Sequence, residues 1–393
     1  MRLLFVAMPD SIHTTRWISQ IQRQGWDVYL FPVSIAQPHS DLKSISIFCS
    51  FIPGKRNREN HVRLVWWTIP FFLADFVISK IKGSPISIYK TKALAFIIRW
   101  LQPNIVHSLE LQHSGYLTME ARKGFGSTFP TWVVSVWGSD LFLFGRLREH
   151  KTTIRATLEK CDYFMSECPR DVLLAKNAGF KGKVLPHIPG PGGFDISLME
   201  SLRETGKTSG RKTVILKGYQ HWAGRALVGL RALRLCADLL QNFTLVISVA
   251  SPEVRIAAEL FSQDTNVPIE IIPPVSHEAM LRYYGRARIY IGLSISDGLP
   301  NSLLEAMLMG AFPIQSSTAC TDGWIEDGKS GFIVPPEDPH AVAEAIRRAL
   351  RDDALVDRAA EINAKTARER LDYSIIQPQV VKMYRDIYDA RKE

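Results

Sequence analysis

The sequence predicts an α/β protein built from two doubly wound, parallel-sheet domains. Three observations carry this prediction. The chain has 393 residues, which is more than one ordinary hydrophobic core accommodates. Short apolar runs alternate with amphipathic stretches in both halves, as in parallel sheets whose two faces are covered by helices. A segment rich in Pro and Gly, PHIPGPGGFDI (186–196), separates the two halves.

The elements of the first half follow from the spacing of its apolar residues. Strands are predicted at 3–7, 27–33, 104–108 and 131–137. Helices are predicted between them at 14–24 and 115–123. The opening apolar run is broken by Pro9 and Asp10, too early for a signal-peptide core, so it is interpreted as a strand. The most apolar stretch, 64–78, is short for a membrane-spanning helix. It is either a core helix or, because basic residues flank it, an interfacial element on a membrane.

The second half repeats the same alternation. Strands are predicted at 213–218, 243–250, 287–294 and 312–316. Helices are predicted at 224–240, 277–285 and 339–351, with a further helix ending at Gly310. These elements place an N-terminal domain at 1–195 and a C-terminal domain at 196–368. A helical tail at 369–393 is expected to pack back on the N-terminal domain.

The net charge indicates the class of binding partner, and the cysteine content indicates the redox state of the thiols. The net charge is +9, and residues 1–190 carry 24 Lys and Arg against 13 Asp and Glu. A basic half suggests a polyanionic partner, and without a nucleic-acid motif an anionic membrane surface is favoured over nucleic acid. The five cysteines form no CxxC pair, which favours reduced thiols over a disulfide framework or a zinc site.

Ligands of doubly wound sheets bind beyond the carboxyl ends of the strands, so residues that follow strands are the candidates. In the first half these are His13, Arg16, His107, Trp137, Ser139 and Asp140. Asp140 either caps the helix that follows it or faces a sugar hydroxyl. A lone histidine at a strand end, such as His107, is more often structural than functional.

Two cations in the second half predict a phosphate site. Lys217 ends a predicted strand, and Arg225 opens the helix that follows. The free N–H groups and the dipole of a helix N-terminus favour anions, and the two side chains complete the neutralisation. The alternative is two exposed basic residues that occur here by chance.

The stretch SISDGLPNSLLEAML (294–308) carries two acids, Asp297 and Glu305. Helical side chains lean toward the N-terminus, so Glu305 is expected to point back toward the turn that Asp297 precedes. Carboxylates bind vicinal hydroxyls, and free N–H groups bind phosphate. A nucleotide sugar has both groups, so the expected contacts are Glu305 and the turn residues Gly298, Leu299, Pro300, Asn301 and Ser302.

The chain resembles the retaining glycosyltransferases of family 4, which have the GT-B fold. The family motif E-G-x-P-x-S-x-x-E-A matches DGLPNSLLEA (297–306), with Asp297 in place of the first glutamate. Further matches are HTTRW (13–17), PNIVHS (103–108), SVWGSD (135–140), GGFD (192–195) and WIEDGKSGFIVPPED (324–338). The resemblance implies two Rossmann-like domains that face a central cleft.

The resemblance also implies roles for individual residues. Glu305 would hold the ribose hydroxyls of the nucleotide, and Asp297 would lie near the donor sugar. Lys217 and Arg225 would correspond to the family's diphosphate-binding pair, here in reversed order and at longer spacing. Trp137 stands where many members have a histidine beside the transferred sugar, which leaves Asp140 as the nearest candidate there.

The expected function is transfer of a sugar from a nucleotide donor to an acceptor hydroxyl with retention of configuration, in the synthesis of cell-surface polysaccharide or glycolipid. Asp140, Asp297, Lys217 and Arg225 would be catalytic, and no metal or cofactor is expected. The partners would be a glycan or lipid-linked acceptor and an anionic membrane, with the protein peripheral on the cytoplasmic face of the plasma membrane. Two alternatives are a non-catalytic nucleotide-sugar or glycan binder and a sugar-nucleotide 2-epimerase on the same fold.

Overall fold

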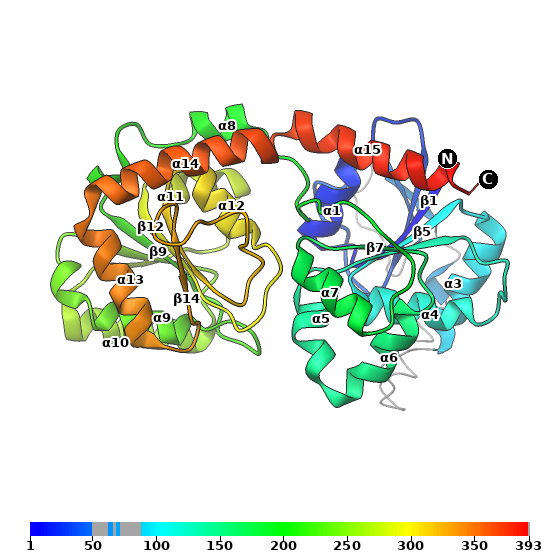
Figure 1. The fold of residues 1–393 in the computed structure, drawn as a ribbon, viewed down its shortest axis with the longest axis horizontal. Helices are drawn as coiled ribbons and strands as arrows, with labels where there is room; N and C mark the ends of the chain where they lie inside the picture. The colour runs from blue at the N-terminus through cyan, green and yellow to red at the C-terminus, as the bar shows by residue number, and fades with distance from the viewer. Residues whose placement is uncertain (49–61, 66–67, 71–87, 392–393) are drawn as a thin grey trace. The chain divides into compact units, whose positions relative to one another are not determined.

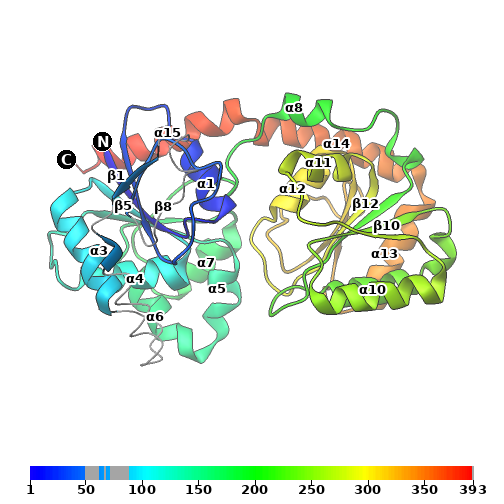
Figure 2. The ribbon, with the colours of Figure 1, turned by 180° about the vertical axis from the view of Figure 1, so that it is seen from behind.

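The computed structural model describes residues 1–48, 62–65, 68–70 and 88–391, which form two compact units (Figures 1 and 2). Unit 1 comprises Met1–Gly193 and Ile376–Glu393, and unit 2 comprises Phe194–Ile375. The first unit therefore ends two residues before the boundary predicted at 195. The chain re-enters unit 1 at Ile376, later than the predicted start of the tail at 369.

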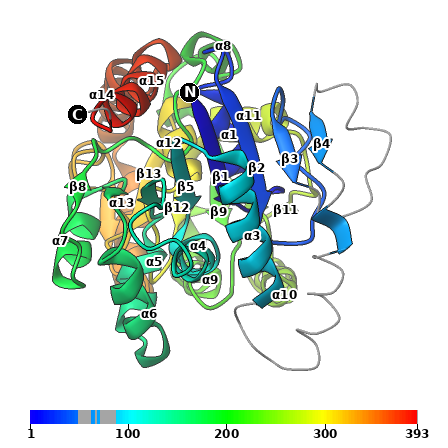
Figure 3. The same cartoon turned by 90° about the vertical axis from the view of Figure 1, so that its right-hand side faces the viewer.

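Unit 1 contains a parallel sheet whose described strands run in the order β4-β3-β2-β1-β5-β6-β7-β8. Figure 3 shows β1 to β4 following one another across this sheet. The strands are β1 (Arg2–Ala7), β2 (Asp27–Pro32), β3 (Ser46–Phe48), β4 (Arg63–Val65), β5 (Ile105–Leu109), β6 (Thr131–Ser135), β7 (Tyr163–Met165) and β8 (Lys183–Val184).

Helices cover both faces of this sheet, as the apolar strands require. They are α1 (Ile12–Ser19), α3 (Ile88–Leu101), the π-helix η3 (Leu111–Gly115), α4 (Tyr116–Arg122), α5 (Ser139–Phe142), the 3₁₀ turn η4 (Phe144–Arg146), α6 (Arg148–Leu158), α7 (Pro169–Asn177) and α15 (Tyr373–Asp389). In β1, Leu4 and Val6 pack with α3, α4, α6 and α7. Leu3 and Phe5 face the other way and pack with α1 and α15. The C-terminal helix is thus part of the core of unit 1.

Unit 2 contains a second parallel sheet, in the order β11-β10-β9-β12-β13-β14 among the residues described. Its strands are β9 (Thr213–Lys217), β10 (Thr244–Ser248), β11 (Ile269–Ile271), β12 (Ala287–Gly292), β13 (Phe312–Ser316) and β14 (Phe332–Val334). Its helices are α8 (Ile196–Ser201), η5 (Thr208–Gly210), α9 (Ala226–Arg234), η6 (Ala237–Leu239), α10 (Pro252–Thr265), α11 (His277–Gly285), α12 (Asn301–Leu308), α13 (Pro339–Arg351) and α14 (Asp353–Leu371). Helices α9, α10 and α13 lie together on one face, and α11, α12 and α14 lie on the other (Figure 1).

Each sheet has a point at which the strand order reverses. In unit 1 the chain builds β2 on one side of β1 and later adds β5 on the other side. In unit 2 it builds β10 beside β9 and later adds β12 on the opposite side. Neighbouring loops diverge at such a point and leave a crevice beyond the carboxyl ends of the strands, where ligands of this fold bind. The loops after β1, β5, β9 and β12 are therefore the first places to examine.

The sequence predicts the central strands but not the short outer ones. Strands β3, β4, β7, β8, β11 and β14 were not predicted. Helix α1 ends at Ser19 instead of reaching Gln24, and α9 ends at Arg234. Within the apolar stretch at 64–78, Leu64 and Val65 belong to β4 and residues 68–70 are helical. Positions 66–67 and 71–78 lie outside the described residues, so both interpretations of this stretch stay predictions. A search of the described chain finds no helix long and apolar enough to cross a membrane.

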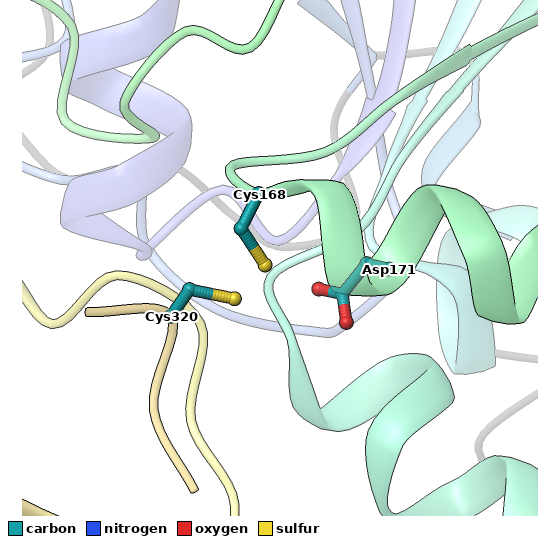
Figure 4. A group of neighbouring side chains, drawn as sticks. All are labelled: Cys168, Asp171 and Cys320. Carbon is teal, nitrogen blue, oxygen red and sulfur yellow. The ribbon is translucent and has the colours of Figure 1, made fainter. Parts of the chain in front are cut away.

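The described cysteines occupy buried positions. Cys161 and Cys236 are free, and burial raises the pKa of their thiols to about 12 and about 11. Cys168 precedes α7, and its sulfur lies within 4.8 Å of the carboxylate of Asp171 (Figure 4). Arg170 pairs with that carboxylate at 2.9 Å. Cys320, drawn in the same figure, belongs to the loop after β13 in unit 2.

Candidate functional site

The two loops at the reversal point of unit 2 are joined by backbone hydrogen bonds. The amide of Arg225 donates to the carbonyl of Leu293 at 3.0 Å, and the amide of Ile295 donates to Ala223 at 2.9 Å. Gly224 allows this close approach, because a Cβ at that position would lie 2.3 Å from the carbonyl oxygen of Tyr219. The loop after β9 and the loop after β12 therefore hold their side chains in a fixed relation.

Lys217 and Asp297 meet at this point, as expected for residues that follow β9 and β12. The Lys217 Nζ lies 3.5 Å from Asp297 Oδ2, and the two side chains are 20% and 29% exposed. Burial pulls the pKa of Lys217 down, but Asp297, Tyr290 and Tyr219 outweigh it, so this pKa stands above its ordinary value. The site thus holds a fixed, partly desolvated ammonium group.

Glu305 belongs to α12 and lies close to the same group of charges. It is 6% exposed, and its Oε1 is 2.8 Å from His277 Nε2 at the start of α11. Buried Tyr290 interacts electrostatically with Lys217, Asp297 and Glu305, while its hydroxyl is 2.7 Å from Ser302 Oγ. Burial raises the pKa of Tyr290, so this phenol is neutral at ordinary pH. The structure therefore gathers one cation and two carboxylates around β12.

Arg225 is placed differently from Lys217. Its Nε donates to Glu337 at 3.0 Å, and its NH1 donates to the carbonyls of His221, Ala223 and Gly224. The guanidinium thus stabilises its own loop, and the sequence prediction that Lys217 and Arg225 bind one phosphate stays a prediction. The imidazole of His221 is the group that lies near Lys217, Asp297 and Arg225 together, and burial lowers its pKa.

The turn before α12 is held by its own backbone. The Gly298 amide donates to Asp297 Oδ1 at 3.0 Å, and the Gly298 carbonyl accepts from Cys320 at 2.8 Å. Leu299 is buried, and Pro300 stands one residue before the helix, which begins at Asn301. The turn is therefore a rigid connection that fixes the angle at which α12 leaves the sheet.

In unit 1, His13 and Trp137 come together although they follow different strands. Their ring centroids are 5.1 Å apart, with 33° between the ring planes. Ser11 caps α1 by accepting from the His13 amide at 3.2 Å. Arg16 is half-buried one turn further along α1, and Ser139 is the first residue of α5. His13 and Trp137 thus form an aromatic surface at the carboxyl edge of this sheet.

His107 is inside the core, not at the ligand-facing edge where the sequence analysis placed it. It is 1% exposed, and its ring nitrogens lie 2.6 Å from Tyr384 Oη and 2.6 Å from Ser135 Oγ. Burial lowers the pKa of His107 to about 3, so the imidazole is neutral. Tyr384 belongs to α15, so His107 ties the C-terminal helix to the sheet and has a structural position.

Asp140 is also buried, with 5% of its surface exposed. Its two carboxylate oxygens accept from the amides of Leu111 and Trp137, both at 2.7 Å. Burial and the nearby Glu110 carboxylate raise the pKa of Asp140 to about 7. Asp140 is not the capping residue of α5, because Gly138 occupies that position with φ of 87°. Asp140 therefore braces the loops that follow β5 and β6.

Two family models match most of the chain. The model described as glycosyl transferase 4-like matches residues 2–167, and the model described as glycosyl transferases group 1 matches residues 220–352. The chain belongs to this family of glycosyltransferases. The two matched ranges fall in unit 1 and unit 2, respectively.

Curated relatives match this chain over only part of its length. A D-inositol 3-phosphate glycosyltransferase from Nocardioides sp. is 29% identical over 104 residues, which are 26% of this chain and 23% of the relative. A phosphatidyl-myo-inositol mannosyltransferase from Mycobacterium leprae is 32% identical over 85 residues, 22% of either chain. The matched stretches thus span less than a quarter of the length of these relatives.

Solved structures match the fold of this family member over almost its whole length. A sucrose-phosphate synthase from Thermosynechococcus elongatus aligns with a TM-score of 0.68 at 17% identity, over 99% of this chain and 100% of that one. Anabaena HepE in complex with UDP-glucose aligns with a TM-score of 0.66 at 12% identity, over 98% and 100%. At these identities the likeness establishes the GT-B fold alone.

Sequence reasoning missed several polar residues of this glycosyltransferase family member. His221 lies in the loop after β9, and His277 is the first residue of α11. Glu110 and His113 follow β5. Glu110 and His113 carry a signal that could have selected them, since an acid directly after a buried strand and an imidazole three residues later lie in one loop. His277 carried no such signal, because only the packing of α11 against α12 brings it to Glu305.

Proposed function

We propose that this protein transfers a sugar from a nucleotide-sugar donor to an acceptor hydroxyl, with retention of anomeric configuration. The observation that carries the proposal is the group formed by Lys217, Asp297 and Glu305 at the point where the strand order of unit 2 reverses. A nucleoside diphosphate sugar offers phosphates to the ammonium and vicinal hydroxyls to the carboxylates. Family membership and the alignment with HepE, which was solved with UDP-glucose, support the same ligand class.

Four residues of the site in unit 2 have a proposed role in this reaction. Lys217 neutralises the diphosphate, and Glu305 accepts hydrogen bonds from the ribose hydroxyls while His277 holds its other side. Asp297 orients Lys217 and lies toward the donor sugar. Departure of the nucleoside diphosphate is the difficult step, and a fixed cation in a poorly solvated site stabilises the charge that develops there. The departing phosphate oxygen accepts the proton of the acceptor hydroxyl.

Unit 1 is proposed to bind the acceptor. Its carboxyl edge presents His13 and Trp137 as an aromatic surface suited to a sugar ring. The excess of Lys and Arg in residues 1–190 supports a peripheral association with anionic lipid, where a glycan or lipid-linked acceptor would be found. A role in cell-surface polysaccharide or glycolipid synthesis on the cytoplasmic face of the plasma membrane is part of this proposal.

Replacement of Glu305 with alanine tests the donor site. The variant is expected to bind the preferred nucleotide roughly 10- to 100-fold more weakly, because hydrogen bonds to a charged group contribute about 1.5–3 kcal/mol. Binding is measured by calorimetry with UDP, GDP and ADP after a thermal-shift screen of the three. The matched control is Glu278→Ala, whose exposed carboxylate pairs with Arg282 on α11. Equal affinities of the Glu305 variant and the wild type would remove Glu305 from the donor site.

Turnover separates the proposed enzyme from the non-catalytic binder that the sequence analysis left open. An enzyme consumes the donor, and the Glu305 variant does so more slowly, whereas a binder shows no turnover in either protein. A 2-epimerase would release free nucleoside diphosphate without any need for an acceptor.

Metal removal tests how the leaving group is stabilised. We expect that treatment with EDTA, followed by desalting, leaves the rate of transfer within about twofold of the untreated rate, because Lys217 supplies the positive charge. The measurement compares turnover of the treated enzyme with and without added Mg²⁺ or Mn²⁺. A large loss that either ion restores would show that a metal shares this role.

A further inference from the structure

The loop after β5 in unit 1 has an unusual backbone at Glu110. This residue has φ of 78° and ψ of 159°, a backbone conformation that residues other than glycine rarely adopt. The π-helix η3 follows at once, from Leu111 to Gly115. Both features are costly locally, and both are concentrated at functional sites. The loop lies beside the reversal point of the sheet, between β1 and β5.

Buried hydrogen bonds hold this loop in place. Glu110 is 6% exposed, and its Oε1 accepts from the amides of His113 and Ser114 at 2.7 and 2.6 Å. Asp140, in the short helix α5 that follows β6, accepts from the Leu111 amide at 2.7 Å, and its own carbonyl accepts from Gln112 Nε2 at 2.9 Å. Two buried carboxylates therefore fix the backbone on both sides of His113.

The side chain of His113 is the exposed part of this rigid loop. It is 69% exposed, whereas the Glu110 side chain that it contacts is 7% exposed. The His113 Nδ1 lies 3.2 Å from Glu110 Oε2, and because a carboxylate only accepts, Nδ1 carries the proton. In the neutral imidazole, Nε2 is then a hydrogen-bond acceptor. Among the residues that the structure describes, Nε2 has no hydrogen-bond partner.

We propose that His113 binds the acceptor, with its Nε2 accepting a hydrogen bond from a sugar or polyol hydroxyl. Glu110 and Asp140 are positioning residues that fix the orientation of the imidazole. The inference rests on the proposed glycosyltransferase function and adds a named contact on unit 1. A hydroxyl fits this position because the imidazole is an acceptor with fixed orientation, and the loop is at the edge of the sheet where ligands of doubly wound folds bind.

The charges around His113 predict how binding depends on pH. The hydrogen bond that His113 donates to Glu110 raises the pKa of His113, and burial lowers this pKa. The Coulombic effects of Glu110 and Asp140 raise it, whereas that of Lys90 lowers it. The pKa of His113 therefore stands above 6.5. Protonation of Nε2 removes the acceptor lone pair, so affinity for a hydroxyl should rise as the pH increases through this pKa. A Glu110→Gln change should move that rise to lower pH.

The test uses the full chain with four hydroxylated probes: octyl β-D-glucoside, octyl α-D-mannoside, octyl β-D-galactoside and myo-inositol. Transfer from the donor to each probe is measured together with hydrolysis of the donor in the absence of a probe. The variants are His113→Asn, which keeps a polar group near the position of Nδ1, and His113→Gln, which places an amide near that of Nε2. The control is His340→Asn, an exposed histidine on α13 of unit 2.

The expected result is at least a tenfold higher KM for the best probe in His113→Asn, with unchanged donor hydrolysis. In His113→Gln the KM should rise less, and its dependence on pH between 6 and 9 should be weaker than in the wild type. The inference is overturned if KM and its pH dependence match the wild type, if donor hydrolysis falls in parallel, or if the wild type hydrolyses the donor but uses no probe. A wild type that neither hydrolyses the donor nor transfers its sugar to any probe would instead contradict the proposed function itself, and with it the role assigned to His113.

Discussion

Replacement of Lys217 with methionine is expected to lower the turnover number by about a thousandfold at saturating donor. Methionine keeps the length and apolar stem of lysine but lacks the charge. Lys217 is 20% exposed, so its charge acts in a medium that screens less than bulk water does. The phosphate charge that develops as the bond to the sugar breaks would then have no compensating cation at this position.

The Lys217 prediction has a matched control next to the same strand. Lys212 precedes β9 at the opposite end, where its Nζ lies 5.1 Å from the ring centroid of Phe243. Lys212→Met should leave both the turnover number and KM close to those of the wild type. A Lys217→Met enzyme that loses less than tenfold in turnover number would show that this cation does not carry the phosphate chemistry.

Asp297 affects the protonation of Lys217, so an Asp297 variant is needed to interpret the Lys217 result. It lies 3.5 Å from the ammonium and, by its charge, raises the pKa of Lys217. Asp297→Asn keeps the size of the side chain and removes that charge, so Lys217 becomes easier to deprotonate. Activity of this variant should fall at high pH more steeply than activity of the wild type. A pH profile measured from 7 to 10 distinguishes this effect from a direct loss of contact with the donor sugar.

The second large effect concerns the stability of unit 1. Tyr384→Phe is expected to destabilise it by roughly 2–4 kcal/mol, because two buried polar groups lose their partner. The Trp17 Nε1 donates to Tyr384 Oη at 2.9 Å, and Tyr384 Oη lies 2.6 Å from His107 Nδ1. Since Tyr384 accepts from the indole, its own proton goes to His107 Nδ1, and His107 Nε2 donates to Ser135 Oγ. Loss of one hydroxyl interrupts this whole chain.

The same chain predicts acid sensitivity. In the unfolded chain His107 takes up a proton near its ordinary pKa of 6.5, but in the folded state burial delays this until a pH of about 3. The unfolded state therefore binds more protons between these values, so stability falls as the pH decreases from 6.5 toward 3. A shift of this size corresponds to roughly 4–5 kcal/mol at the acid limit.

Both effects are measured by urea unfolding of the full chain at pH 7 and pH 5, with hydrogen exchange of peptides from β5 and α15 to assign the transition to unit 1. Tyr373→Phe, at the exposed start of α15, is the control and should change stability by less than about 0.5 kcal/mol. His107→Gln should reduce the acid-dependent part of the loss. An equally strong loss on acidification in that variant would place the proton uptake at another group.

The pattern of apolar residues in the sequence was sufficient to predict the central strands of each sheet. Strands β1, β5, β9 and β12 are mostly apolar, because a parallel strand buried on both faces exposes few of its side chains to water. The short outer strands carried little signal. β8 has two residues and β11 has three, and such segments become strands only because a neighbouring strand offers hydrogen-bond partners.

The sequence by itself determined the fold class, the family and the residues that follow the central strands, because these depend on local periodicity and on contiguous motifs. Only the tertiary structure decided which of those residues meet. It paired Lys217 with Asp297 and Glu305 with His277, buried His107 against Tyr384, and turned Arg225 onto its own loop. It also held His113 on a backbone that Glu110, which follows β5, and Asp140, in α5, fix together. Such contacts join residues far apart in the chain, so their geometry follows from strand order and helix packing, which no local pattern encodes.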